Sequence, residues 1–342
     1  MSEEKIVFTP QEAELVEKLK NRTYLDPRYD AAFKALLNDE AALVSFLNGV
    51  LHLAEKERIV KVEIRNPELN ILFPETKSFR FDIRATTESG YGINVEMQKV
   101  SPTNFTERIL LQHSAFVIQS KYEYDKKYKE LFPLEPTEEQ RAEREARRYD
   151  FPPTYAIWVC DFKIARQKGY HDVWSISNGE GLTVTEKIKY IMLDLSQFTK
   201  SEGSLENDED RWLYLIKNAG QAESLPNFDD EVFADALRRI FVGNANKQLL
   251  KDQVNNMMTD DEHLDFIAYH TVEAKRKGHA EGHAEGLAEG RAEGRAEGRA
   301  EGRAEGLAEG CSSTLDAVRE AGASDELMTR IKEILAGKEK LV

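Results

Sequence analysis

Apolar and polar residues alternate along several short segments of this chain, and a spacing of two predicts β-strands. Two of these segments, 79–86 and 91–98, are separated by the short turn Glu88-Ser-Gly90 and therefore predict a hairpin at about residues 79–100. The other predicted strands are residues 59–64, 155–160 and 190–195.

Apolar residues spaced by three and four positions predict helices on either side of these strands. The stretch 31–51 is a long amphipathic example, and Asp30 stands directly before it, where a side-chain oxygen can cap the first backbone amides. A run of alternating charges, 138–148, is typical of a solvated helix or a loop insertion. The other predicted helices are residues 11–21 and 104–129, with further core segments at 212–216 and 232–241.

Glycine recurs at every fourth residue from 278 to 310, mostly as Gly-Arg-Ala-Glu or Gly-His-Ala-Glu. Each glycine lowers helix stability by about 1 kcal/mol relative to alanine, and within one helix the Glu and Arg residues do not meet at a spacing of three or four. Two interpretations stay open: helices of two chains that pair along glycine and alanine with Glu opposite Arg, or a flexible low-complexity linker. His279 and His283 exchange with Arg and Leu in the repeat, so we expect no metal role for them.

The segment 311–342 carries a small set of apolar positions on either side of Gly322, which predicts a tail of two short helices. So few apolar residues do not form an independent core, and the tail needs a second copy or the body of its own chain. We therefore expect a homo-oligomer that forms through the repeat and the tail. The residues expected to be buried are Leu315, Val318, Leu327, Ile331 and Leu335.

The formal net charge of the 342 residues is −15. This charge is unfavourable for a DNA-binding protein, because binding to phosphates relies on basic groups. A local basic face, or a divalent cation held by the protein, would supply the missing positive charge. No apolar run is long enough to span a bilayer and no secretory signal is visible, so we expect a cytoplasmic protein without membrane contact.

The predicted hairpin holds the residues with the most evident chemistry. Alternation places Phe81, Ile83 and Ala85 on one face of its first strand and Asp82 on the other. If the hairpin turn centres on Ser89, antiparallel pairing places Asp82 directly across from Glu96, and Gln98 shares the face of Glu96. Opposed carboxylates repel, and a bound Mg²⁺ or Mn²⁺ would relieve that repulsion. The other interpretation is that these three residues are the polar outer face of an edge hairpin.

Several motifs stand in the order found in the Rpn family of recombination-promoting nucleases, which are transposase-like members of the PD-(D/E)xK superfamily. The likeness covers roughly residues 25–275. The motifs that carry it are Asp30-x-x-Phe33-Lys34, Asn66-Pro67-Glu68, Asp82, Val95-Glu-Met-Gln98 and Glu107-Arg108. The chain is therefore identified as resembling this family.

The resemblance implies an α/β fold with a restriction-endonuclease-like mixed sheet flanked by helices and a helical C-terminal extension. It also implies metal-dependent cleavage of DNA. Asp82 and Glu96 match the metal-binding carboxylates, with Mg²⁺ as the first expectation and Mn²⁺ or Ca²⁺ as alternatives. Gln98 takes the place usually held by lysine and brings only a dipole to the phosphate, so we expect slower chemistry. Lys99 is adjacent, but strand alternation directs it to the other face.

Three accessory positions follow from the same motifs, each with a simpler alternative. Asp30 either extends the acidic site or caps its helix. Lys34 contacts phosphate or is a solvated helix lysine, and Arg108 pairs with Glu96 or touches phosphate, or forms an ordinary surface ion pair.

The predicted division is a nuclease-like domain at 1–275, the tetrapeptide repeat at 278–310 and the helical tail at 311–342. The predicted function is a metal-dependent DNA endonuclease linked to DNA recombination, mobile elements or defence. The alternative is a nuclease-derived interaction or oligomerisation protein with weak or no catalysis, which the acidic charge and the absent lysine favour. Strand joining by a transposase is a third possibility.

Overall fold

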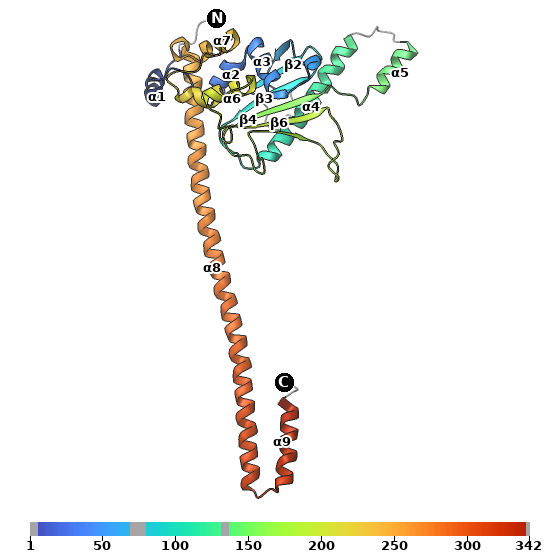
Figure 1. Ribbon diagram of the computed structural model, residues 1–342, viewed down its shortest axis with the longest axis vertical. Coiled ribbons are helices and arrows are strands. Elements are labelled where there is room, and N and C mark those ends of the chain that lie inside the picture. The colour runs from blue at the N-terminus through green and yellow to red at the C-terminus, as the bar shows by residue number, and fades with distance from the viewer. Residues whose placement is uncertain (1–5, 69–79, 131–136, 340–342) are drawn as a thin grey trace. The chain divides into compact units, whose positions relative to one another are not determined.

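The computed structural model describes residues 6–68, 80–130 and 137–339, so residue 79 of the predicted hairpin lies outside the described residues. A six-stranded sheet has the order β1-β2-β3-β4-β6-β5 (Figure 1). Its strands are β1 (Val62–Arg65), β2 (Ile83–Thr87), β3 (Gly92–Gln98), β4 (Thr154–Cys160), β5 (His171–Ser175) and β6 (Ile188–Asp194). β4 pairs in parallel with β3 and β6, and the other neighbours are antiparallel, so the sheet is mixed.

Helices cover both faces of this sheet, which confirms the predicted α/β class. One face buries residues such as Ile83, Val95 and Ile157 against helices that supply Phe46 and Trp212. The other face lies against α4, whose Ile109 packs with Trp158 and Met192. The helices are α1 (Pro10–Lys20), α2 (Asp30–Leu37), α3 (Glu40–Leu51), α4 (Phe105–Glu130), α5 (Glu138–Ala146), α6 (Asp208–Asn218), α7 (Glu231–Ile240), α8 (Lys247–Glu320) and α9 (Asp325–Glu339).

The predicted helix at 31–51 is two helices, α2 and α3, and the single-helix prediction was wrong. They are interrupted at Asn38-Asp39, and the Asp39 carboxylate accepts a hydrogen bond from the Ala42 amide at the start of α3. The apolar spacing continues across this break, and for that reason the pattern alone did not reveal it. Capping by Asp30 is also wrong, because Tyr29 is the N-cap of α2 and Asp30 is its first helical residue.

α4 packs closely on the sheet at Gly92, where an added Cβ would lie 2.9 Å from Ser120 Oγ and 3.0 Å from the Phe116 ring. This close packing buries His113, which is 1% exposed. Its Nε2 lies 3.0 Å from Thr154 Oγ1, and its ring packs edge-on against Tyr190. Burial disfavours the charged imidazole and lowers the pKa of His113 to about 4.

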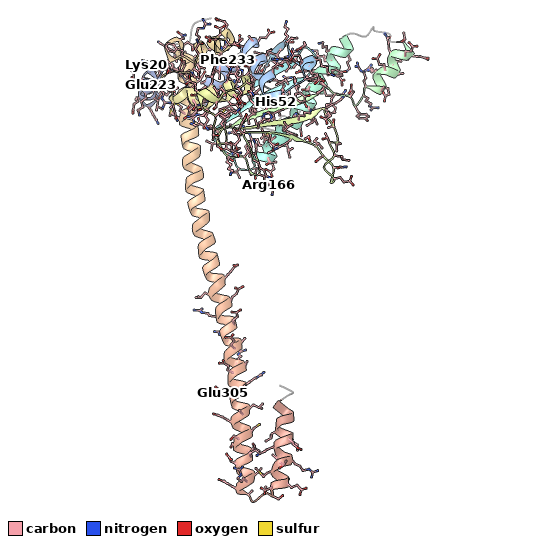
Figure 2. The ribbon with its side chains drawn as sticks, in the orientation of Figure 1. Lys20, His52, Arg166, Glu223, Phe233 and Glu305 are labelled. Carbon is pink, nitrogen blue, oxygen red and sulfur yellow. The ribbon has the colours of Figure 1, made fainter. Side chains whose placement is uncertain are left out.

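The chain divides into two compact units, Met1–Leu264 and Asp265–Val342. The division predicted from the sequence, at 275 and 310, stays a prediction. In the second unit the repeat is helical, and its described side chains are exposed, including the labelled Glu305 (Figure 2). The side chains of His279 and His283 lie outside the described part of the chain.

A turn at Gly322, where φ is +81°, ends this helix and leads into α9. Among the described side chains of α9, Met328 is the buried one, at 8% exposed, whereas Leu327 is 48% exposed. Leu327 is therefore not buried within the single chain, and its predicted burial against a second copy stays a prediction.

Burial of His113 predicts a stability change in acid. The folded-state pKa of about 4 lies below the usual histidine value of 6.5, so between these pH values the unfolded chain binds a proton that the folded chain does not. Stability contributed by the neutral ring is therefore lost as the pH falls from 6.5 towards 4. We expect the free energy of unfolding, measured with urea, to fall between pH 7.5 and pH 5 by about 2 kcal/mol less in His113→Gln than in the wild type. Equal pH dependence in the two proteins would contradict this assignment.

Candidate functional site

The β2–β3 hairpin has the register expected from its sequence, with Ile83 opposite Val95 and Arg84 opposite Asn94. One step further towards the open end, this register sets Asp82 against Glu96. Asp82 lies in a bend directly before β2. The Met97 amide donates to Asp82 Oδ2 at 2.7 Å, and the backbone amide of Asp82 hydrogen-bonds to the Glu96 carboxylate. These crossed bonds hold the two carboxylates together where the hairpin opens.

The bend also changes the face on which Phe81 lies. Alternation predicted that Phe81 shares the face of Ile83 and Ala85, but Phe81 packs edge-on against Phe116 of α4, at 5.4 Å between ring centroids. Ile83 and Ala85 lie in the core on the other side of the sheet. The prediction was wrong because strand geometry begins only after Asp82.

Glu96 is buried, at 4% exposed, and it has side-chain partners on α4 and on its own strand. Gln112 Nε2 donates to Glu96 Oε1 at 3.0 Å, and Asn94 Nδ2 lies 3.5 Å from the same oxygen. Arg108, one helical turn before Gln112, is exposed and stabilises the charged carboxylate electrostatically. Burial outweighs these effects and raises the pKa of Glu96 to about 7.

Asp82 has a similar electrostatic environment. Burial is the largest cause that raises its pKa well above the usual range, followed by the charges of Glu96 and Asp30, while Lys34 opposes the shift. Three carboxylates that repel one another favour either bound protons or a bound cation. Since carboxylate oxygens are the ligands that Mg²⁺ and Mn²⁺ prefer, the donor set fits a divalent metal ion.

A cleft of about 440 Å³ opens beside Asp82. Lys34 lies in it, with its Nζ 2.6 Å from Asp30 Oδ1 and 3.6 Å from Asp82 Oδ1. The structure therefore brings Asp30 and Lys34 to the same cleft as Asp82. The cleft is lined by Asp30, Ala31, Lys34, Arg80 and Asp82 from one side and by Leu249, Asp252, Asn255 and Asn256 from α8.

The first turns of α8 fix the helix that carries Asp30 and Lys34. The Ala31 amide donates to Asn256 Oδ1 at 2.9 Å, and the Ala32 amide donates to Gln253 Oε1 at 3.2 Å. No side chain of the preceding residues caps α2, so α8 satisfies amides that a helix N-terminus leaves unpaired. Sequence reasoning missed these α8 residues and Gln112. The available signals were the polar residues around Val254, namely Asp252, Gln253, Asn255 and Asn256, and the spacing of Gln112 four residues after Arg108.

Gln98 lies at the end of β3, and its amide is engaged locally. Its Nε2 donates to the Val100 carbonyl at 3.1 Å, not to either carboxylate. The neighbouring Lys99 lies 3.4 Å from the centroid of the Tyr29 ring, on the side of the segment that leads into α2. The structure thus brings Asp82 and Glu96 together and leaves the Gln98 amide directed along its own strand.

A family model for PD-(D/E)XK nuclease family transposases matches residues 27–262. The chain belongs to this family. The match spans the whole sheet and ends inside α8, after the residues that line the cleft, and it supports a nuclease-like function. No curated protein and no solved structure matches the chain. Among the described residues, no helix combines the length and apolar character that a bilayer span needs.

The repulsion at the hairpin predicts that removing one charge stabilises the metal-free protein. A carboxyl whose folded pKa is raised contributes stability at low pH and loses it as the pH rises through that pKa, which for Glu96 is about 7. At pH 8 in EDTA, Asp82→Asn should therefore raise the free energy of unfolding by about 2 kcal/mol. Glu63→Gln, at an exposed carboxylate of β1, should leave it nearly unchanged. A less stable Asp82→Asn protein would contradict the repulsion.

Proposed function

We propose that this chain is a metal-dependent DNA endonuclease that hydrolyses phosphodiester bonds, with Asp82 and Glu96 as the ligands of a divalent cation. The observation that carries the proposal is the pair of opposed, hydrogen-bonded carboxylates with raised pKa values beside a cleft that holds Lys34. Mg²⁺ is the first candidate, with Mn²⁺ or Ca²⁺ as alternatives. When bound, such a cation activates water and stabilises negative charge on the scissile phosphate.

The other residues of the cleft orient and neutralise the substrate. Lys34 supplies a fixed cation 3.6 Å from Asp82, close enough to contact a phosphate oxygen that enters the cleft. It brings to the site a positive charge that Gln98 lacks, although it comes from a helix and not from the strand. Gln112 holds the Glu96 carboxylate in one orientation. Gln98 orients the water or phosphate once its amide leaves the Val100 carbonyl.

A basic cleft of about 430 Å³ between α4 and α5 supports DNA as the substrate. It stands out in a chain whose net charge is −15, because six of its lining residues are basic and two are acidic. We propose that it binds the phosphate backbone of DNA. The basic residues are Lys121, Lys129, Arg141, Arg144, Arg147 and Arg148, and the acidic ones are Asp125 and Glu145.

We also propose that chains associate through the C-terminal unit. The glycines of the repeat leave open space at their Cα atoms, so a second helix can approach closely. In α9, Leu327 and Ile334 remain 48% and 61% exposed after the hairpin with α8 has formed. Two subunits would offer one active site for each strand of a duplex. DNA recombination, mobile-element activity or defence is the biological setting that we propose.

Plasmid nicking tests the catalytic proposal. Asp82→Ala and Glu96→Ala should each abolish nicking of supercoiled plasmid in Mg²⁺ or Mn²⁺, because each removes a ligand of the cation. Glu63→Ala, on β1 of the same sheet, is the matched control and should retain full activity, and EDTA should stop every variant. Nicking by a folded Asp82→Ala protein, or in EDTA, would overturn the proposal. A wild type that binds DNA without cutting under any metal would favour the non-catalytic alternative.

Charge reversal tests the basic cleft. Arg141→Glu with Arg144→Glu should weaken DNA binding by at least about tenfold and flatten its dependence on salt, because fewer counterions are released. Lys18→Glu with Lys20→Glu makes the same change in charge on exposed residues of α1. Binding curves from fluorescence anisotropy at several salt concentrations distinguish the two pairs. If both double variants lose the same affinity for DNA, only the net charge matters and the cleft is not a DNA-binding site.

Light scattering tests the association. Truncation after Lys277 should lower the oligomeric state, and Leu327→Lys with Ile334→Lys should do the same in the full chain, because both changes remove the exposed apolar residues of α9. Leu182→Lys, at a residue 63% exposed in the first unit, is the control. If the truncated protein keeps the same number of subunits as the full chain, the repeat is a linker and not the site of association.

A further inference from the structure

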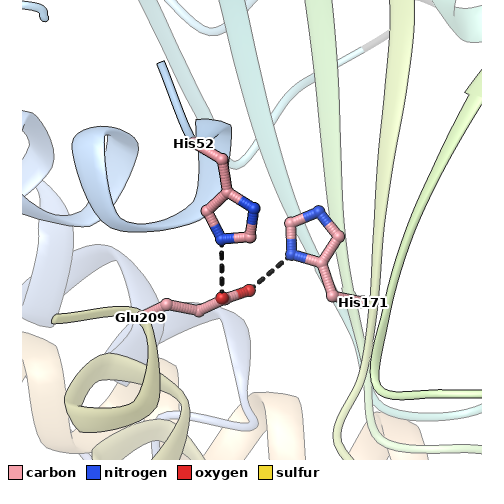
Figure 3. A group of neighbouring side chains, drawn as sticks. All are labelled: His52, His171 and Glu209. Atoms are coloured by element: carbon pink, nitrogen blue, oxygen red, sulfur yellow. Dashed lines mark hydrogen bonds and ion pairs between the residues drawn. The ribbon is translucent and has the colours of Figure 1, made fainter. Parts of the chain in front are cut away.

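A second cluster of metal-binding side chains lies away from the hairpin carboxylates in the chain. His52 follows the last residue of α3, His171 begins β5, and Glu209 is the second residue of α6. Their donor atoms all lie within 4.8 Å of one another. Figure 3 shows the two imidazoles converging on the Glu209 carboxylate from different elements.

The packing around this cluster fixes its geometry. Gly49 lets α3 approach α6, because a Cβ at that position would lie 2.9 Å from the Glu209 amide nitrogen. One turn away, Trp212 Nε1 donates to Ser45 Oγ at 3.0 Å and joins the same two helices. Beside His171, the Tyr170 hydroxyl lies 3.2 Å from Asp210 Oδ1 and ties β5 to α6. The three donors are therefore held by elements that are bonded independently of the donors themselves.

Glu209 is a buried carboxylate that faces the two histidine rings. Its side chain is 3% exposed, and its oxygens lie 2.8 Å from His52 Nε2 and 2.5 Å from His171 Nδ1. His171 is also enclosed, at 14% exposed, whereas His52 is 58% exposed. The cluster is thus closed on the side of the sheet and open to solvent at His52, which gives an ion a path of entry and leaves room for a water ligand.

His52 has a left-handed backbone, with φ at +47°, a conformation that is uncommon for residues other than glycine. This backbone directs the ring onto Glu209 and stacks it 4.6 Å from the His171 ring. Two stacked imidazoles beside one carboxylate supply two nitrogens and an oxygen. That donor set suits Zn²⁺ with water as the fourth ligand, in contrast to the all-oxygen set of the hairpin.

We propose that His52, His171 and Glu209 form a second metal site, which takes a divalent transition metal and Zn²⁺ in particular. Donor atoms of a tetrahedral zinc site lie about 3.3 Å apart, given bonds of about 2.0–2.1 Å. The His52 and His171 nitrogens, at 2.8 and 2.5 Å from the Glu209 oxygens, therefore move outward by about 0.5 and 0.8 Å when the ion enters, and the exposure of His52 leaves room for its shift. The bound ion joins α3, β5 and α6. The competing explanation is a metal-free hydrogen-bonded cluster.

The experiment uses the full chain in a background without two other groups of candidate ligands. Asp82→Asn and Glu96→Gln remove the hairpin site, and His279→Ala with His283→Ala removes the histidines of the repeat. Calorimetric titration of this background with Zn²⁺ should give one ion per chain, and Co²⁺ should give the absorption bands of a tetrahedral site. Thermal unfolding should shift upward with Zn²⁺.

His52→Asn is the decisive variant, because asparagine tolerates the left-handed backbone and the side chain is exposed. It should weaken Zn²⁺ binding at least about tenfold and abolish the cobalt bands. Glu209→Gln should do the same if it folds, and His52→Asn decides alone if it does not. The matched control, His113→Gln, changes a histidine outside the cluster and should bind Zn²⁺ normally. No Zn²⁺ binding by the background, or binding that His52→Asn leaves unchanged, would overturn the proposal.

Discussion

The candidate site depends on holding Asp82 and Glu96 together although their carboxylates repel each other. Two carboxylates at the open end of a hairpin would separate if nothing held them. The Met97 amide fixes Asp82, and Gln112 of α4 fixes Glu96, so each carboxylate is tied to a different part of the fold. Burial raises the pKa of both carboxyls, and the charge of Glu96 raises that of Asp82 further. A bound cation would offset this unfavourable negative charge and so stabilise the two ionised carboxylates.

The same site depends on a helix that comes late in the sequence. The first turns of α8 cap α2 through Gln253 and Asn256 and also line the cleft. α2 in turn carries Lys34 towards Asp82. The family match ends at residue 262, so it includes this part of α8 and leaves out the repeat. The cleft therefore belongs to the nuclease-like unit as a whole and not to the hairpin alone.

Local sequence patterns predicted the parts of the site that are local in the chain. Alternation and the turn near Ser89 were sufficient to pair Asp82 with Glu96, because a hairpin register follows from its turn. The family, and with it the α/β class, followed from the order of the motifs. The face on which Phe81 lies could not be predicted, because a bend interrupts the alternation at Asp82.

The remaining features require tertiary contacts that no periodicity contains. Gln112 reaches Glu96 only because α4 crosses the sheet, and Asn256 reaches α2 from more than two hundred residues away. The cluster of His52, His171 and Glu209 combines three elements whose sequences carry no common motif. Domain limits and catalytic roles taken from the sequence remain predictions until they are measured.

Anomalous diffraction from crystals of the full chain grown with Mn²⁺ tests the central claim most directly, because it locates the ion without reference to activity. Our account predicts a peak at the manganese edge between the carboxylates of Asp82 and Glu96, absent from crystals of Glu96→Gln. A peak confined to His52, His171 and Glu209, or an unchanged peak in Glu96→Gln, would contradict it.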